Sequence, residues 1–378
     1  FKQKTAYEIM PSLVGSEMCI RDRSICMASD QKIRIGVIGA GENTRKFHIP
    51  NFQKIEGVEV ISVCNRSKES GQKVADEFSI QKVFTNWKDL VKDPDINAVC
   101  IGTWPYMHKT LVEAALNNGK HVMTEARMAD SYENAKDMLS LSKESPGLIA
   151  QIVPAPMTLK FDKYIRQIIA EKEIGEIIQI DISISHQTPL TVNAGYPDYG
   201  SEYHWRNNLN LSGMNIMQLG IWYEAMMRWV GPAKNVYSRS KTVVNIKKDY
   251  EDYSFVEIPD HINIIGDLQI GATYNIKMST VQGNAQKDGV WIFGTEGTLM
   301  LDCIDYVLYK GDRKSNLKEI VVPDNYQSFW RVEEEFISAI RGKELITHTP
   351  FETGVKYMEF TEAARKSANS GERIDLSI

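Results

Sequence analysis

An apolar run that ends in a glycine turn is the feature that most constrains how this chain can fold. Ile33 to Ile38 is short and rich in β-branched residues, and Gly39-Ala40-Gly41 follows it directly. A stretch with helical periodicity then continues towards Phe52. This order is typical of a strand, a tight turn and a helix. The start of the chain after residue 32 is therefore predicted to be a βα unit.

The same alternation repeats over the next hundred residues. Apolar runs at Val58 to Cys64 and Ala98 to Thr103 each precede a helical stretch, and the second of these helices ends at Asn117-Asn118-Gly119 before the run His121 to Thr124. Strands that alternate with helices at this spacing form parallel sheets with helices on both faces. The loops after the strands share one edge of the sheet, where a ligand is expected to bind.

After about residue 150 the pattern changes. Isoleucines alternate with polar residues in Ile178 to Ser185, which is typical of a strand with one exposed face. Helices are expected at Asp162 to Glu173, Gly213 to Val230 and Trp330 to Arg341. We therefore predict a Rossmann-type α/β domain with a parallel sheet over residues 30–150. An α+β domain with a large open, mostly antiparallel sheet is predicted over residues 151–378.

Composition excludes several classes of function. The net charge of −5 contains no long run of either sign, so nucleic acid is not an expected partner. No apolar stretch approaches the roughly 20 residues that span a bilayer, and the five cysteines have no metal-binding spacing. A cytoplasmic protein without a metal site is expected. Residues 1–29 are interpreted as a leader outside the fold, with Met27 as the natural start.

The glycine turn predicts a dinucleotide site. Gly39 and Gly41 match two of the three glycines of the G-x-G-x-x-G pattern, and Thr44 stands in the third position. The second strand ends in Asn65-Arg66-Ser67, where an NAD-selective site offers a carboxylate to the ribose. Arg66 and Ser67 could bind a 2′-phosphate, which favours NADP(H) over NAD(H), or form a solvated loop. The predicted cofactor-binding residues are Gly39, Gly41, Asn43, Thr44, Asn65, Arg66, Ser67, Thr103, Trp104 and Glu125.

Several motifs occur in an order that resembles one family. They are Thr103-Trp-Pro-Tyr-Met-His108, Gly119-Lys-His-Val-Met-Thr-Glu125 and Gly294-Thr-Glu-Gly-Thr-Leu-Met-Leu301. Together with the glycine turn they resemble the glucose-fructose oxidoreductase / inositol dehydrogenase (Gfo/Idh/MocA) family. The resemblance implies that Glu125 lies near the nicotinamide ribose. The family's Glu-Lys-Pro motif, whose lysine lies near the substrate, is replaced by Glu125-Ala126-Arg127, and the family's pocket Asp and His are replaced by Gln218 and Trp222.

Gln218 and Trp222 stand four residues apart and are expected to share a helix face that points into a substrate pocket. Because neither can take a proton, we predict other catalytic groups: His204 first, then His108, with Tyr106 third. A structural role remains the alternative for each histidine.

Three aromatic or basic features surround the predicted pocket. Trp205 and Arg206 could stack on a sugar and hold a carboxylate or hydroxyl, or could simply pack at a domain seam. The stretch from Gln187 to Tyr203 is long for a connection and is interpreted as a substrate lid or a surface loop.

The leading hypothesis is an NAD(P)-dependent oxidoreductase that acts on a sugar, polyol or related small carbonyl compound. Two alternatives stay open: a catalytically silent NADP(H)-binding sensor or scaffold, and a glycosidase that uses its cofactor transiently. A small-molecule substrate is the expected partner. We also expect a homo-oligomer that forms through the open sheet of the second domain.

Overall fold

A computed structural model describes residues 32–185, 195–214, 216–285 and 288–377. The expected leader, residues 1–29, lies outside the described residues, as does most of the expected lid. In the first half, six described strands form one parallel sheet in the order β3-β2-β1-β4-β5-β6. Its strands are β1 (Ile33–Ile38), β2 (Val58–Cys64), β3 (Lys82–Phe84), β4 (Ala98–Ile101), β5 (His121–Thr124) and β6 (Ala150–Ile152). The strand order reverses between β1 and β4, and such a switch point is where parallel sheets bind ligands.

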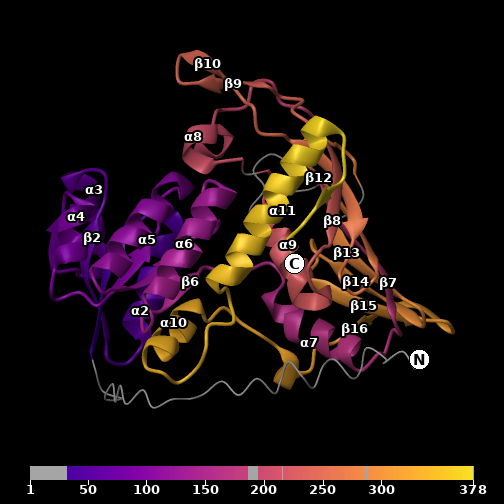
Figure 1. The fold of residues 1–378 in the computed structure, drawn as a ribbon, viewed down its shortest axis with the longest axis horizontal. Coiled ribbons are helices and arrows are strands. Elements are labelled where there is room, and N and C mark those ends of the chain that lie inside the picture. The colour runs from indigo at the N-terminus through magenta and orange to yellow at the C-terminus, as the bar shows by residue number, and fades with distance from the viewer. Residues whose placement is uncertain (1–31, 186–194, 215, 286–287, 378) are drawn as a thin grey trace. The chain divides into compact units, whose positions relative to one another are not determined.

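Helices cover both faces of this sheet (Figure 1). The connecting helices are η2 (Thr44–His48, a π-helical turn), α2 (Ile49–Lys54), α3 (Lys68–Phe78), α4 (Trp87–Lys92), η3 (Pro105–Met107), α5 (His108–Asn117) and α6 (Tyr132–Glu144). One face packs on Phe52 of α2, Val74 of α3 and Phe336 of α10 (Val332–Ile340), which comes from the far end of the chain. Leu111 of α5 and Met138 of α6 belong to a second buried cluster on the other face. The first sheet is thus completed by a helix that follows the second sheet in sequence.

Nine strands of the second half form one sheet in the order β16-β15-β14-β13-β7-β12-β11-β8-β17, as far as the described residues go. Only β7 and β12 pair in parallel among them. Ile180, Ile182 and Ile184 of β7 are buried while the residues between them are partly exposed, as the alternating pattern predicted. The bounds are β7 (Ile177–Ile184), β8 (Asn235–Lys241), β11 (His261–Asp267), β12 (Thr273–Ser279), β13 (Gly289–Gly294), β14 (Gly297–Asp302), β15 (Val307–Asp312), β16 (Ser315–Ile320) and β17 (Ile374–Asp375). The two sheets confirm the predicted fold class.

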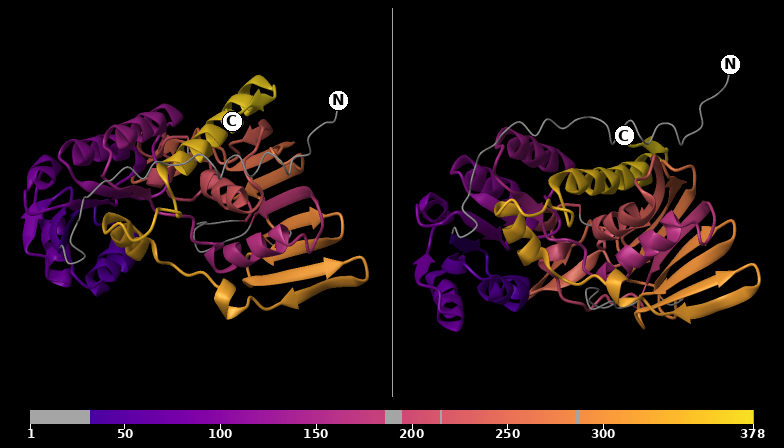
Figure 2. Two further views of the ribbon diagram at one scale, coloured as in Figure 1. Left: turned by 60° about the horizontal axis from the view of Figure 1, so that its bottom comes forward. Right: turned by 90° about the horizontal axis from the view of Figure 1, so that it is seen from below.

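Helices pack against one face of the large sheet and leave its other face open (Figure 2). They include α7 (Leu159–Ala170), α9 (Leu219–Val230) and α11 (Phe351–Ser370), and α11 contacts β8, α6 and α9. Short elements lie around them: η4 (Trp205–Asn207), α8 (Leu209–Ser212), η5 (Asp324–Tyr326) and the hairpin β9 (Ile246–Asp249) to β10 (Asp252–Phe255). No helix in the described part of the chain is long and apolar enough to cross a bilayer. Buried contacts run continuously from α6 to α9, so the division at residue 150 stays a prediction.

Two helices differ from the sequence-based expectation. The helix expected from Gly213 begins only at Leu219, because Gly213 has a φ of +67° and Met217 and Gln218 are left-handed, with φ of 38° and 65°. The helix Phe351–Ser370 was missed. Its buried side includes polar and small residues as well as aromatic ones, which weakens the apolar periodicity that reveals a helix.

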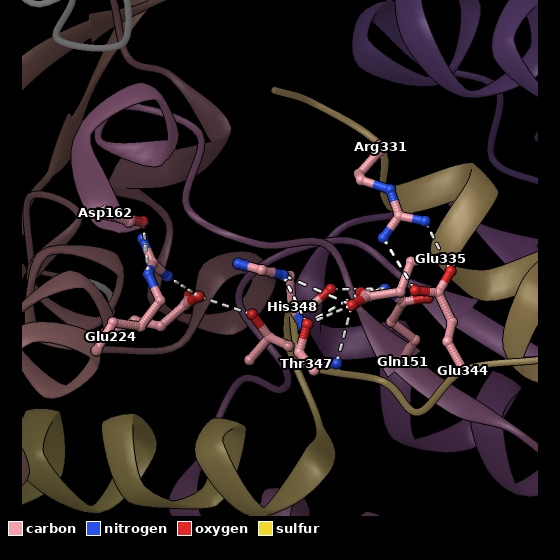
Figure 3. Close-up of polar contacts among 10 residues, drawn as sticks. Gln151, Asp162, Glu224, Arg331, Glu335, Glu344, Thr347 and His348 are labelled. Carbon is pink, nitrogen blue, oxygen red and sulfur yellow. Dashed lines mark hydrogen bonds and ion pairs between the residues drawn. The ribbon is translucent and has the colours of Figure 1, made fainter. Parts of the chain in front are cut away.

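A buried polar network joins the two halves (Figure 3). The Glu335 carboxylate of α10 accepts hydrogen bonds from Gln151 Nε2 of β6 (2.8 Å) and from the backbone N–H groups of Thr347 (3.0 Å) and His348 (3.1 Å). Glu224 of α9 is also buried and accepts a hydrogen bond from Thr349 Oγ1 (2.7 Å). The segment after α10 is therefore anchored to both the last parallel strand and α9.

Candidate functional site

The backbone of the glycine turn requires glycine. Gly39 has a φ of +83°, and a Cβ there would lie 2.7 Å from Thr103 Cγ2 and 2.8 Å from the Thr103 nitrogen. The turn is tied to the end of β2, because the Ala40 N–H donates to Asn65 Oδ1 (2.8 Å) and the Gly39 N–H donates to the Cys64 carbonyl (2.9 Å). Asn65 thus holds the turn in shape and leaves no carboxylate at this position.

A cavity of about 380 Å³ opens beside this turn, and we call it the glycine-turn cavity. A Cβ on Gly41 would meet its nearest neighbour only at 3.8 Å, so the backbone there stands open. Arg66 is exposed at the rim, with its guanidinium carbon 4.9 Å from the centre of the Trp104 ring. An open backbone and a cation fit the phosphates of a dinucleotide. The residues present therefore suit a nicotinamide dinucleotide.

The other residues predicted to bind the cofactor surround this cavity in different ways. Ser67 caps α3, because its Oγ accepts a hydrogen bond from the Ser70 N–H (3.2 Å). Thr44 is buried behind the turn, with its hydroxyl 3.4 Å from the Gly39 carbonyl, whereas Asn43 is exposed. Thr103 lines the cavity and packs against Gly39.

Glu125, at the end of β5, belongs to a buried three-residue cluster. His48 of η2 lies between two carboxylates, with its Nε2 3.0 Å from Glu125 Oε1 and its Nδ1 2.6 Å from Glu333 Oε1. Trp330 Nε1 also donates to Glu333 Oε2 (2.9 Å). The cluster links η2, β5 and α10, so the position of Glu125 depends on residues nearly three hundred positions apart in sequence.

The protonation states in this cluster follow from burial and mutual attraction. Burial lowers the pKa of His48, but hydrogen bonds and charges of Glu125 and Glu333 outweigh it and raise the pKa to about 9. Burial raises the pKa of Glu125, yet the hydrogen bond and charge of His48 lower it overall. At neutral pH an imidazolium therefore faces an ionised Glu125.

His108 occupies a different environment. Its side chain is fully buried, with Nδ1 2.9 Å from the Arg127 carbonyl and Nε2 3.0 Å from the Thr103 carbonyl. Burial lowers the pKa of His108. The ring therefore ties the loop after β4 to the loop after β5.

A second cavity, of about 440 Å³, lies against the segment that precedes α9, and we call it the Gln218 cavity. It is lined by Arg127 from the loop after β5, by His204 and Arg206, and by Lys247 of β9. Gln218 itself lines the cavity in a left-handed conformation. Such strained non-glycine backbone is concentrated at functional sites. Two of the predicted substrate-binding residues, Arg206 and Gln218, are thus brought together with His204.

His204 is exposed to the Gln218 cavity, and one side of its ring is already engaged. Its Nδ1 accepts a hydrogen bond from the Arg206 N–H (3.2 Å). Burial and the charges of Arg206 and Lys247 lower the pKa of His204. A neutral ring whose Nδ1 accepts carries its proton on Nε2, so the free side of His204 is a hydrogen-bond donor.

Two stacked aromatic rings lie close to the linings of both cavities. The rings of Trp104 and Trp205 are stacked at 5.6 Å with an interplanar angle of 18°. Trp104 lines the glycine-turn cavity, and Arg206, whose guanidinium carbon lies 4.3 Å from the Trp205 ring centre, lines the Gln218 cavity. The aromatic pair therefore connects the lining of one cavity to the lining of the other through Arg206.

Two further predicted residues lie outside the Gln218 cavity. Trp222 is fully buried one turn into α9, and its Nε1 has no hydrogen-bond partner among the described residues. Tyr106 is exposed and lines the glycine-turn cavity instead. Trp205 is not in the lining either, and the aromatic residue that lines the Gln218 cavity is Tyr203.

Sequence reasoning missed four residues of these sites. His48 and Glu333 lie far apart in sequence, so no local pattern signals their contact with Glu125. Arg127 was visible only as a departure from the Glu-Lys-Pro motif. Lys247 lies on the polar hairpin β9–β10, for which the sequence pattern predicted no role. It donates a hydrogen bond to Ser201 Oγ (2.7 Å), and burial lowers its pKa. A family-wide comparison of residue 127 is the signal that could have found one of them.

Comparison with known proteins identifies the family. Residues 33–151 match the model of an oxidoreductase family with an NAD-binding Rossmann fold, and residues 163–300 match the GFO/IDH/MocA C-terminal domain. The two matches together cover more than half of the chain. This protein is therefore a member of the Gfo/Idh/MocA family, which confirms the resemblance predicted from its motifs.

Individual relatives are distant. The chain is 30% identical over 177 residues to a 4-carboxy-2-hydroxymuconate-6-semialdehyde dehydrogenase of a Sphingobium species, covering 47% of this chain and 54% of that one. It is 33% identical over 145 residues to a 1,5-anhydro-D-fructose reductase of Ensifer adhaerens, covering 38% and 43%. It thus spans about half the length of these two relatives. A levoglucosan dehydrogenase solved with NADH and levoglucosan has the same fold, with a TM-score of 0.79, 18% identity and coverage of 92% of this chain and 100% of that one.

Proposed function

We propose that this protein is an NAD(P)-dependent oxidoreductase that acts on a sugar, polyol or related small carbonyl compound. One observation carries the proposal: a cavity suited to a dinucleotide and a second cavity with several titratable side chains are connected through the stacked Trp104 and Trp205, since Trp104 lines the first and Arg206, which lies over Trp205, lines the second. The names of the relatives support the class, because they describe a semialdehyde dehydrogenase, an anhydrofructose reductase and a levoglucosan dehydrogenase.

The glycine-turn cavity holds the cofactor in this proposal. The open backbone at Gly41 lets the pyrophosphate approach the turn, and Arg66 can lie over the adenine. Glu125, outside the lining of this cavity, is assigned to a ribose hydroxyl on the family resemblance. The bound nicotinamide supplies the hydride acceptor or donor. We propose NADP(H) as the preferred form, because Arg66 is exposed at the rim and Asn65 carries no charge that would repel a 2′-phosphate.

The Gln218 cavity binds and orients the substrate. The free Nε2–H of His204 donates to the oxygen of the reacting carbon and polarises it, much as a neutral imidazole can act as an electrophile. Lys247 lines the same cavity, and its lowered pKa suits it to exchange the proton with that oxygen. Tyr203 supplies an aromatic lining to the cavity, and His108 ties together the loops after β4 and β5.

A second candidate function is a catalytically silent dinucleotide-binding protein. The observation that favours it is the loss of three titratable groups, because Ala126, Gln218 and Trp222 occupy the positions of the family's Lys, Asp and His. Because Trp222 is buried in the core, position 222 offers the cavity no group that could replace the family's histidine. A silent protein would keep the cofactor site and lose turnover.

Titration with NADPH and NADH, followed by nicotinamide fluorescence, tests both candidates. Tight NADPH binding with weaker NADH binding supports the cofactor proposal, and binding of neither form contradicts both candidates. Turnover of a sugar or carbonyl panel, measured as net nicotinamide absorbance change, separates the enzyme from the silent protein. Glycoside cleavage without net redox change would instead identify a cofactor-assisted glycosidase.

We also propose that the protein forms a homo-oligomer through the open face of the large sheet. Trp291 and Phe293 of β13 lie there beside Asp181, Asn275 and Lys277 in a shallow hollow. A half-apolar sheet face of this kind is seldom left uncovered.

We propose a reducing, cytoplasmic location. Three buried free cysteines support it: Cys64, Cys100 and Cys303.

A further inference from the structure

Arg127 is a buried cation for which the described residues offer no acceptor. Its side chain lines the Gln218 cavity, yet the residue is only 8% exposed. Nε is buried, and no described residue accepts a hydrogen bond from it or from the rest of the guanidinium. Burying a charge in this way is costly unless a partner compensates it.

A second guanidinium adds further unpaired positive charge to the same cavity. Arg206 lines the same cavity from η4 and lies over Trp205 without an ion pair in the described part of the chain. Burial and the charge of Arg206 lower the pKa of Arg127 to about 9, against the weaker attraction of Tyr357. Glu125 and Glu42 attract Arg206 but do not pair with it. Two cations that repel each other therefore face one cavity.

Three acidic residues line the cavity: Glu202 is exposed, and the carboxylates of Asp198 and Asp260 are engaged elsewhere. The two carboxylate oxygens of Asp260 accept the N–H groups of Val243 and Val244, both at 2.8 Å. Asp198 accepts the Gly200 N–H (2.9 Å). Both carboxylates attract Lys247 rather than Arg127. Arg127 and Arg206, which we call the arginine wall, thus have no carboxylate paired with them among the described residues, and two of the three acidic groups of the lining are satisfied by backbone N–H groups.

We propose that the arginine wall binds a carboxylate of the substrate, so that the substrate class is a small hydroxylated carboxylic acid or its carbonyl counterpart. A planar guanidinium offers two parallel donors to a carboxylate, and Arg206 can add a third. The cavity of about 440 Å³ suits a small ligand. The acidic residues that also line the cavity favour a monoanion over a dianionic phosphate. This inference rests on the proposed function for the redox step, but not for the binding itself.

Isothermal titration of the NADPH-loaded full chain tests the inference with two matched probes. D-gluconate and D-glucitol share the same carbon skeleton and differ at one end, where the first has a carboxylate and the second a hydroxymethyl group. We expect gluconate to bind about tenfold or more tightly than glucitol, because a charge-assisted pair exceeds a neutral hydrogen bond by about this factor. Added salt should reduce the difference between the affinities for gluconate and glucitol.

Variants assign the effect to the arginine wall. Arg127→Gln should weaken gluconate binding by about tenfold and leave glucitol binding unchanged, and Arg127→Lys should lie between, because it keeps the charge without the planar fork. Arg313→Gln is the control, since Arg313 is exposed and pairs with Glu296 on the far hairpin. If Arg127→Gln fails to fold, judged by NADPH affinity and the unfolding midpoint, Arg206→Gln decides in its place.

Three outcomes would overturn the inference: equal affinities for the two probes, an equal loss for both in the variant, or tighter binding of glucose 6-phosphate than of gluconate. Because binding is measured without turnover, its failure is separable from that of the proposed function. Selective gluconate binding with no redox turnover would keep the carboxylate site and remove the oxidoreductase. Turnover of neutral sugars without a carboxylate preference would do the reverse.

Discussion

The glycine-turn cavity and the Gln218 cavity are assembled in different ways. The first draws its lining from one stretch of chain, residues 38–107, in which each loop follows a strand of the parallel sheet. The second collects residues 127, 198–207, 217–218, 244–260 and 280–281 from five separate segments. A site made of consecutive loops is visible as a motif, whereas a site made of distant segments takes its chemistry from neighbours that no local pattern specifies. The cofactor class was therefore accessible from sequence, and the charge of the substrate was not.

The buried cluster around His48 tests how self-contained the first site is, and it carries the largest expected effect. Replacing His48 by Gln leaves Glu125 and Glu333 buried without their shared cation. Removing one partner of a buried ion pair costs about 3 to 5 kcal/mol, so we expect a loss of this size in the free energy of unfolding. Urea unfolding measures it, and a loss below about 1 kcal/mol would show that the cluster does not hold the site together.

The same cluster predicts a pH dependence. The folded-state pKa of His48 is raised to about 9 from 6.5, so its contribution is fully present below pH 6.5 and is lost as the pH rises through 9. The free energy of unfolding of the wild-type protein should fall by a few kcal/mol as the pH rises from 6.5 through 9, and His48→Gln should not show this decrease. His121→Gln is a matched control, because the pKa of His121 is lowered to about 4 by burial and the ring is neutral throughout the window.

The glycine turn offers a second test. Gly39→Ala adds a Cβ against Thr103 at a φ of +83°, and we expect a loss of dinucleotide binding together with about 2 to 4 kcal/mol of stability. Gly119→Ala is matched for conformation, since its φ is +70° but nothing lies within 4 Å of the added atom. That control should cost only about 1 to 2 kcal/mol and keep cofactor affinity. Equal losses of stability and of dinucleotide affinity in the two variants would mean that backbone strain, not the contact with Thr103, explains why the turn requires glycine.

The fold was largely predictable from sequence because its signals are local. Apolar runs at fixed spacing gave the parallel sheet, and the alternation in Ile177–Ile184 gave the half-exposed strand. The start of α9 was wrong because Gly213 closely approaches the Asp130 carbonyl, with only 1.9 Å left for a Cβ. The helix Phe351–Ser370 was missed because it is buried against several elements and Ser367 and Gly354 lie on its buried side.

The candidate site was predictable only where motif and geometry coincide. Arg206, His204 and Gln218 do line one cavity, but the expected pairing of Gln218 with Trp222 does not form there, because Gln218 precedes the helix and Trp222 turns into the core. Arg127 and Lys247 enter the cavity through tertiary packing that the sequence pattern does not encode. Their charges, rather than the motif residues, give this cavity its electrostatic character.

Arg66 provides a smaller effect that is confined to the first site. If it pairs with a 2′-phosphate, Arg66→Gln should weaken NADPH binding by about 1.5 to 3 kcal/mol and leave NADH binding nearly unchanged. Fluorescence titration of both cofactors measures this difference. Lys73→Gln serves as a control on the same helix segment, since Lys73 pairs with Glu69 in solvent. An equal loss for both cofactors would place Arg66 against the base through its contact with Trp104, not against the phosphate.

The stacked Trp104 and Trp205 set the smallest and most direct test, because they join the two sites. If the stack couples the cavities, the double-mutant cycle of Trp104→Leu and Trp205→Leu should give a coupling of about 0.5 to 1.5 kcal/mol in the free energy of unfolding. Trp205→Leu should also weaken NADPH binding, although Trp205 does not line the glycine-turn cavity. Tyr164 and Tyr326, a ring pair at the same 5.6 Å separation but away from both cavities, are the control and should leave cofactor affinity unchanged. If the losses in the free energy of unfolding are additive, the two sites are in contact but are not energetically coupled through the stack. Any communication between cofactor and substrate would then have to pass through Glu125 and Arg127.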